Sequence, residues 1–178
     1  SLHELKNKLH AWNMEIPVLP EGDTQGTIGG LLATKSATAS TFHHGTIREW
    51  IESVTLVVDT GEEHHIRDGI TPSGRLLAIY QKIFPLLTEQ GPILRASKPE
   101  NADDASGYSI WGTSIGPRQL LDQLVGSEGT LGIITSITVR VSPIKKEALT
   151  VSLSFPNINA LSSALLVAKH HSAENIFM

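Results

Sequence analysis

The sequence predicts an α+β fold with a mostly antiparallel sheet flanked by helices. Apolar residues recur at helical spacing in some segments and alternate with polar residues in others, as they do in half-buried strands. Asp59-Thr60-Gly61 separates two of the alternating segments, which is typical of an antiparallel hairpin. Strands and helices follow one another without the strict strand–helix–strand order of a parallel sheet, and this favours the α+β class.

The chain is expected to begin with a helix that ends near Asn13. Its leucines recur at helical spacing, and Ser1 with Glu4 forms the pattern of a capping box. Pro17 and Pro20 follow, and proline disfavours a continuing helix. The chain should therefore approach its first glycine-rich stretch in an extended form.

The middle of the chain should hold a hairpin and a long helix. Residues 53–58 alternate imperfectly, which predicts a strand buried on much of both faces, and residues 62–66 form its partner. Thr71-Pro72 starts a helix that Pro85 should kink or split in two. Residues 97–116 are polar and turn-rich, which predicts a long loop over the sheet with a functional role.

A further helix and strand should follow that loop. Pro117 sits at the start of the helix, whose apolar residues form one buried face. Those residues are Leu120, Leu121, Leu124 and Val125. Residues 133–141 then alternate as a strand does. Ile133, Ile137, Val139 and Val141 should point to one face of that strand.

Three more elements are expected near the end of the chain. Residues 149–155 alternate and predict a second strand. Asn159 should cap a helix that carries Leu161 and Leu165 on its apolar face. Residues 176–178 are apolar and predict the beginning of another strand.

The composition argues against several classes of function. The formal net charge of the 178 residues is −4, and no basic block exceeds Lys145-Lys146, so a generic nucleic-acid surface is not expected. No apolar run approaches the ~20 residues of a membrane span, and the first residues lack a signal-peptide pattern. The chain has no cysteine, which removes disulfides and thiolate sites and favours a cytoplasmic location.

Two glycine-rich loops carry the strongest functional signal. They are Gln25–Thr34 and Gly126–Thr135, and each adjoins the start of an apolar element. Glycine tolerates positive φ and lets a ligand approach the backbone, so such loops can present bare amides to an anion. The first loop also opens a short helix, whose N-terminus would suit a pyrophosphate. Tight helix packing at Gly29-Gly30 is the alternative explanation, but the second loop favours a ligand.

The order of these motifs resembles that of a known flavoprotein family. Gly26–Gly30 is followed by Ala33-Thr34, then by Gly45–Trp50, Gly107-Tyr108 and Leu124–Thr135. This order is similar to the FAD-linked oxidases of the vanillyl-alcohol oxidase and p-cresol methylhydroxylase type. Within them, the similarity is greatest to the branch of D-lactate dehydrogenase and the glycolate oxidase FAD subunit. The resemblance covers about residues 15 to 145.

The resemblance implies a domain organisation and an activity. Residues 1–145 would be the second subdomain of the FAD-binding domain, and residues 146–178 the start of a substrate domain. The first subdomain would precede Ser1, and most of the substrate domain would lie beyond Met178. Members of the family oxidise 2-hydroxy acids or related alcohols by hydride transfer to FAD. The implied partners are FAD, a small 2-hydroxy acid and an electron-acceptor subunit.

The resemblance also implies which residues meet FAD. The cofactor-binding residues would be Gln25, Gly26, Thr27, Ile28, Gly29, Gly30, Ala33, Thr34, His44, Gly45, Glu128, Gly129, Gly132, Ile133 and Ile134. Glu128 would accept amide hydrogen bonds within its loop or reach a ribose hydroxyl. No residue of this chain is implied as a catalytic base, and no metal ligand is implied.

The first loop departs from the family pattern after its Ala-Thr pair. Leu31 and Lys35 stand where asparagines are usual, and Ala37-Thr38 replaces a glycine pair. Lys35 would either bind a phosphate or the flavin, or lie solvated at the surface. The departures leave a second hypothesis open, namely a non-catalytic binding module that kept the fold and lost the flavin.

Six of the eight histidines occur in adjacent pairs: His43-His44, His64-His65 and His170-His171. Adjacent side chains diverge on a strand and on a helix, so one pair gives a metal site only one ligand. Zinc needs three or four ligands, so exposed or half-exposed histidines are expected instead. The pair after the first loop is the exception, because one of its members could lie at the flavin edge.

Overall fold

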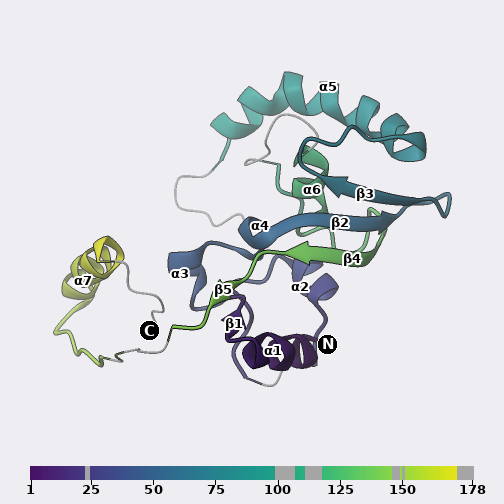
Figure 1. The fold of residues 1–178 in the computed structure, drawn as a ribbon. Helices are drawn as coiled ribbons and strands as arrows, with labels where there is room; N and C mark the ends of the chain where they lie inside the picture. The colour runs from purple at the N-terminus through teal and green to yellow at the C-terminus, as the bar shows by residue number, and fades with distance from the viewer. Residues whose placement is uncertain (23–24, 99–106, 111–117, 146–148, 150, 172–178) are drawn as a thin grey trace.

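The structure is a computed structural model that describes residues 1–22, 25–98, 107–110, 118–145, 149 and 151–171. Its centre is a three-stranded antiparallel sheet in the order β3-β2-β4, and β1 and β5 form a second, two-stranded sheet. Figure 1 shows α5 along one side of the larger sheet, α1 beside the small sheet, and α7 apart from both. The predicted α+β class with antiparallel pairing is therefore confirmed.

The predicted hairpin is formed by β2 (Ile51–Val57) and β3 (Glu63–Arg67). Val54 pairs with Ile66 and Leu56 with His64, and all four side chains are buried. The other residues of β3 are exposed, so one face of the hairpin packs on the core while the other faces solvent.

The third strand, β4 (Ile133–Val139), contains a bulge that changes which side chains face the core. Thr55 pairs with Ser136, but the next residue of β2 pairs with Ile134, so one residue of β4 is skipped. Ile134 therefore packs against the core, whereas Ile133 is 69% exposed. The expectation that Ile133 shares a face with Ile137 is wrong, because simple alternation cannot anticipate an extra residue.

The N-terminal helix agrees with its prediction. α1 spans Leu2–Ala11 and has the expected capping box between Ser1 and Glu4. Beyond it, β1 (Met14–Glu15) pairs with β5 (Ser142–Pro143), a short pairing that the sequence did not indicate.

Three short helices follow before the hairpin. The predicted helix of the first glycine loop is α2 (Ile28–Thr34), capped by Thr27. α3 (Thr41–His44) and α4 (Ile47–Trp50) were not anticipated. A second capping box, between Thr46 and Glu49, begins α4.

The long helix is α5 (Gly74–Ala96), which begins three residues after the predicted Thr71. It runs as one helix with Pro85 and Pro92 inside it, so Pro85 does not split the helix in two, and the kink stays a prediction. α6 (Arg118–Leu124) follows, and the four apolar residues predicted for its buried face are all buried. Pro117 and most of the predicted 97–116 loop lie outside the described residues.

The C-terminal part departs most from the sequence predictions. α7 (Ile158–His170) is capped by Asn157 rather than Asn159, because the Ala160 amide donates to the Asn157 side chain at 3.0 Å. The described residues of 149–155 form no strand, and their apolar side chains are exposed. That prediction is wrong, since alternation gives a strand only where a neighbouring strand pairs with it. Residues 176–178 lie outside the described residues.

A single core joins these elements. It is formed by side chains from α1, the segment before α2, α2, α4, β2, β3, α5 and α6. The most deeply buried are Val18, Leu32, Ile47, Val54, Leu121 and Val125. Within the described residues, no helix is long and apolar enough to cross a membrane.

Candidate functional site

The structure brings the two glycine loops into direct contact. The Gly126 amide donates to the Leu32 carbonyl oxygen at 3.1 Å, and the Glu128 amide donates to Ala33 at 3.0 Å. The last carbonyl groups of a helix have no partner within the helix, so the second loop supplies partners for the end of α2. Two segments more than ninety residues apart therefore form one backbone unit.

The start of α2 is only partly capped. The Thr27 hydroxyl accepts from the Gly30 amide at 3.1 Å. Among the described residues, the amides of Ile28 and Gly29 make no hydrogen bond. Two donors are thus available at the beginning of the helix.

The second glycine loop also contains backbone amides that make no hydrogen bond within the described residues. Its amides at Gly126, Glu128 and Thr130 bond to backbone carbonyls, whereas those of Gly129 and Leu131 bond to nothing within the described part of the chain. Glu128 has a φ of 49°, and Gly129 has a φ of 78°. Amides exposed by such left-handed turns form a concave surface that suits an anion.

The glycines of the two loops differ in what surrounds them, and only some of them are required by the packing of the chain. A Cβ at Gly126 would lie 2.2 Å from the Gly107 carbonyl oxygen, and a Cβ at Gly132 would lie 2.6 Å from that of Val57. These two glycines are required by the packing of the chain itself. A Cβ at Gly29 or Gly129 would meet nothing within 4 Å, so the space beside them is open to a ligand.

Gly29 is the most informative of these glycines. It lies within α2 and does not have a positive φ. Glycine inside a helix lowers stability by roughly 1 kcal/mol relative to alanine. Neither its conformation nor a neighbouring atom among the described residues requires glycine at this position.

Two residues of the predicted site, Thr34 and Glu128, make contacts within the protein. The Thr34 hydroxyl donates to the Gly30 carbonyl oxygen, with 2.9 Å between the two oxygens. Glu128 is exposed, and its backbone amide, rather than its carboxylate, fixes the loop to α2. The ribose alternative for Glu128 stays a prediction.

Lys35 does not lie solvated at the surface. It ends α2 in the left-handed conformation, with a φ of 50°, and only 9% of it is exposed. Its ammonium group donates to the Ser109 hydroxyl at 3.1 Å. The surface alternative is therefore wrong, and the phosphate or flavin alternative stays open.

The segment around Tyr108 was missed as part of the site. Gln123 donates to the Ser109 carbonyl oxygen at 3.2 Å, and the Tyr108 and Thr130 hydroxyls lie 2.6 Å apart. Gly107-Tyr108 is part of the family resemblance, but only tertiary contacts show that this segment packs on the second loop.

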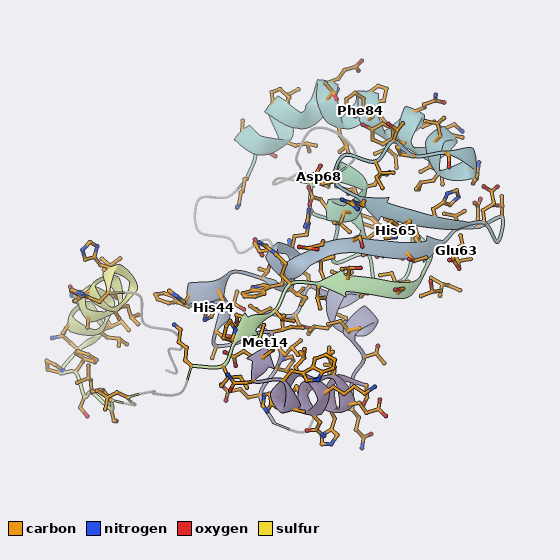
Figure 2. The ribbon with its side chains drawn as sticks, in the orientation of Figure 1. Met14, His44, Glu63, His65, Asp68 and Phe84 are labelled. Atoms are coloured by element: carbon orange, nitrogen blue, oxygen red, sulfur yellow. The ribbon has the colours of Figure 1, made fainter. Side chains whose placement is uncertain are left out.

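His44 and Gly45 lie toward the other end of the sheet. The Trp50 side chain donates to the His44 carbonyl oxygen at 3.1 Å, and Trp50 directly precedes β2. Ile133 pairs instead with Val57, the last residue of β2. Six residue steps along a strand measure about 20 Å, so His44 and the second loop lie at different ends of the sheet. Figure 2 shows His44 on the side where β2 begins.

A shallow hollow of about 550 Å³ lies over the solvent-facing side of the same end of the sheet. Ser53, Arg67, Thr138 and Arg140 are among its lining residues. The Arg140 guanidinium lies over the Trp50 ring, 6.0 Å from its centre. The hollow is thus separate from the contact between the two glycine loops.

The pair His64-His65 diverges as expected on a strand, but His64 is buried, so the expectation of exposed or half-exposed histidines is wrong for this residue. His64 is buried and His65 is exposed, because neighbours on β3 face opposite sides. His64 Nε2 lies 3.3 Å from the Glu62 carboxylate. In the described part of the chain, no group of three or more histidine or acidic side chains could hold a metal ion.

Two exposed carboxylates at the hairpin turn form hydrogen bonds with Arg75. Arg75 forms two hydrogen bonds with the Asp59 carboxylate, at 2.9 and 2.6 Å, and these lower the pKa of Asp59. The Arg75 amide donates to Glu62 at 3.1 Å, and this bond is the main cause of the lowered pKa of Glu62. The hairpin turn is thereby joined to the start of α5.

The fold and the loop contact define an α+β domain in which some amides of both glycine loops make no hydrogen bond within the described residues. Residues 1–67 match the family model described as an FAD binding domain. This match indicates an FAD binding domain, with FAD as its cofactor.

Three curated relatives extend the similarity beyond residue 67. The chain is 26% identical to a D-lactate dehydrogenase of Anaerostipes hadrus over 85% of this chain and 24% of that protein. It is 25% identical to a D-lactate dehydrogenase of Archaeoglobus fulgidus over 95% of this chain and 29% of that protein. It is 24% identical to a mitochondrial D-lactate dehydrogenase (cytochrome) of Arabidopsis thaliana over 87% of this chain and 20% of that protein. The chain thus spans between a fifth and a third of these relatives.

Proposed function

We propose that this chain is the FAD-holding part of an oxidoreductase that removes a hydride from a 2-hydroxy acid of the D-lactate or glycolate kind. FAD supplies the redox chemistry by accepting the hydride, and the protein supplies binding and orientation. The observation that carries the proposal is the joining of the two glycine loops, which leaves free amides on both. The names of the three relatives support the 2-hydroxy acid as substrate.

The proposed FAD contacts fall into two groups. The first is the joined loops, which would hold an anionic part of FAD through the free amides near Gly29 and Gly129. This group contains Gln25, Gly26, Thr27, Ile28, Gly29, Gly30, Ala33, Thr34, Glu128, Gly129, Gly132, Ile133 and Ile134. The second group is His44 and Gly45, toward the other end of the sheet. An extended dinucleotide is long enough to meet both groups.

The remaining parts of the proposal concern the whole protein. Residues 1–145 would belong to the FAD-binding domain and residues 146–178 to the start of a substrate domain. The groups that bind the substrate carboxylate, and the catalytic base, would be supplied by a part of the protein other than residues 1–178. An electron-acceptor subunit and a cytoplasmic location belong to the same proposal.

A second candidate is a module that kept the fold and lost FAD. The burial of Leu31 and Lys35 supports it, because these two positions serve packing and the contact with Ser109. The two candidates differ in one observable property, which is the presence of bound flavin.

The test is to purify the full-length protein and record its visible spectrum. The absorption bands of oxidised flavin, and FAD released on denaturation, are expected. Under anaerobic conditions, D-lactate, glycolate or D-2-hydroxyglutarate should bleach these bands, whereas L-lactate serves as the stereochemical control. A colourless protein that binds no added FAD would support the second candidate. Bound FAD that no 2-hydroxy acid bleaches would contradict the substrate class alone.

A further inference from the structure

Tyr108 presents an aromatic ring beside the second glycine loop. Its hydroxyl lies 2.6 Å from the Thr130 hydroxyl, and the residue is 42% exposed. Two further apolar residues of the loop and the start of β4 are exposed, Leu131 at 38% and Ile133 at 69%. Tyr108 thus combines an anchored hydroxyl with a partly exposed side chain that a ligand could contact.

The direction of the hydrogen bond between the Tyr108 and Thr130 hydroxyls follows from the single proton that each hydroxyl carries. The Thr130 hydroxyl has one proton and lies 2.6 Å from the Ser127 carbonyl oxygen, which can only accept. Thr130 must therefore accept from Tyr108, and Tyr108 is the donor. The chain from Tyr108 through Thr130 to Ser127 fixes the phenol relative to the loop.

The backbone on either side of Tyr108 is also fixed. The Gly107 carbonyl group occupies the space that a side chain at Gly126 would take. Ser109 bonds to Lys35 through its hydroxyl and to Gln123 through its carbonyl oxygen. The backbone beside Tyr108 and its hydroxyl are thus both fixed, and the hydroxyl is bonded to Thr130, which stands between Gly129 and Leu131 in the chain.

We propose that Tyr108 contacts the cofactor, and that its ring stacks on a planar ring of FAD held over the second glycine loop. The proposal rests on the proposed function and adds a residue to its binding site. A ring anchored in advance loses little freedom on binding, which favours affinity. FAD contains two planar ring systems, adenine and isoalloxazine, and both share the stacking chemistry.

The experiment compares four variants of the full-length protein, each first freed of FAD. Tyr108→Leu removes the ring, Tyr108→Phe keeps it, and Thr130→Val removes the hydrogen-bond acceptor. Tyr80→Leu is the matched control, because Tyr80 is the other tyrosine and packs against Phe84 on α5. Dissociation constants for FAD, ADP and FMN are measured together with the thermal midpoint of the free protein.

Tyr108→Leu should weaken FAD binding about ten-fold or more, because a base stacked on an aromatic side chain contributes at that level. Tyr108→Phe and Thr130→Val should weaken it less, and Tyr80→Leu should leave FAD affinity unchanged. If the ring stacks on adenine, ADP binding falls and FMN binding does not. If it stacks on isoalloxazine, FMN binding falls, and the fluorescence of bound flavin rises once the tyrosine is removed.

Unchanged FAD affinity in Tyr108→Leu would overturn the proposal. An equal loss in Tyr108→Leu and Tyr108→Phe would also overturn it, since the hydroxyl rather than the ring would then matter. A loss shared by Tyr80→Leu would reduce the effect to general destabilisation and contradict the assignment. Failure of the proposed function is distinguishable, because the unmodified protein would then bind no FAD.

Discussion

Arg48 and Asp122 form an ion pair that joins α4 to α6 in the interior of the protein. Their side chains are only 12% and 9% exposed, and the Arg48 side chain donates to the Asp122 carboxylate. α4 lies shortly after the first glycine loop, and α6 directly precedes the second. The pair therefore links the two chain segments that position the loops, in addition to the backbone contact between the loops.

Removal of one partner of this pair should be costly. Asp122→Ala leaves the Arg48 charge buried without its ion-pair partner, which typically costs about 3–5 kcal/mol of folding free energy. Replacing both residues by apolar ones of similar size, as in Arg48→Met with Asp122→Leu, should cost much less. Urea unfolding of the two variants measures the difference. Equal destabilisation by the single and the double change would contradict the account of the pair.

Gly126 should be far less tolerant of alanine than Gly61. Both residues have a φ near 80°, so alanine at either suffers the left-handed strain of about 1–2 kcal/mol. At Gly126 the added Cβ also lies 2.2 Å from the Gly107 carbonyl oxygen, whereas at Gly61 nothing lies within 4 Å. Gly126→Ala should therefore lower the free energy of unfolding more than Gly61→Ala, as measured by chemical denaturation. Equal losses would show that the contact between Gly107 and the second loop does not persist in solution.

The attachment of the hairpin turn to α5 should weaken in acid. The pKa values of Asp59 and Glu62 are lowered from their ordinary values of 3.8 and 4.5, mainly by hydrogen bonds from Arg75. A carboxylate with a lowered pKa in the folded state contributes stability above its unfolded pKa, and this is lost as the pH falls through the folded value. The decline should therefore begin near pH 4.5 and continue below it. The effect should be small, because both groups are exposed.

Thermal midpoints between pH 7 and pH 3 check this pH dependence. The Asp59→Asn, Glu62→Gln double variant should be slightly less stable at pH 7 and should lose less stability on acidification than the unmodified protein. Identical pH profiles for the two proteins would show that the Arg75 contacts contribute nothing measurable.

The sequence was sufficient to predict an element where residues close together in the chain determine its structure. Ser1 with Glu4 and Asp59-Thr60-Gly61 are short signals, and the helix cap and the hairpin appeared where they predicted. The sequence was insufficient where a shift of one or two residues changes which side chain is buried or which residue caps a helix. The bulge in β4 exposes Ile133, and the cap at Asn157 lies two residues before the predicted one. Alternation and capping preferences fix the type of an element better than its register.

In the candidate site, too, local features could be predicted from the sequence, whereas contacts between distant segments could not. The residues of both glycine loops were visible in the sequence, because glycine clusters are local features. Their contact through Gly126 and Leu32, the burial of Lys35 and the position of Tyr108 were not, because each depends on packing between distant segments. No periodicity records such contacts, so only the folded chain could add Tyr108 to the candidate site.

Gly29 offers the sharpest test of the loop assignment, because stability and binding should change in opposite directions. Gly29→Ala adds a methyl group to α2 at a place where it meets nothing within 4 Å. Alanine is favoured over glycine inside a helix by about 1 kcal/mol, so the FAD-free protein should become more stable by up to this amount. The same methyl group would occupy the space in which FAD is proposed to approach the backbone. FAD affinity should therefore fall while the thermal midpoint of the FAD-free protein rises. Gly22→Ala is the control for FAD affinity, because that glycine also has open space but lies outside both loops; its φ of 79° makes alanine there destabilising, while FAD affinity should stay unchanged. A stabilised Gly29→Ala protein with unchanged FAD affinity would show that FAD does not approach α2 at this residue.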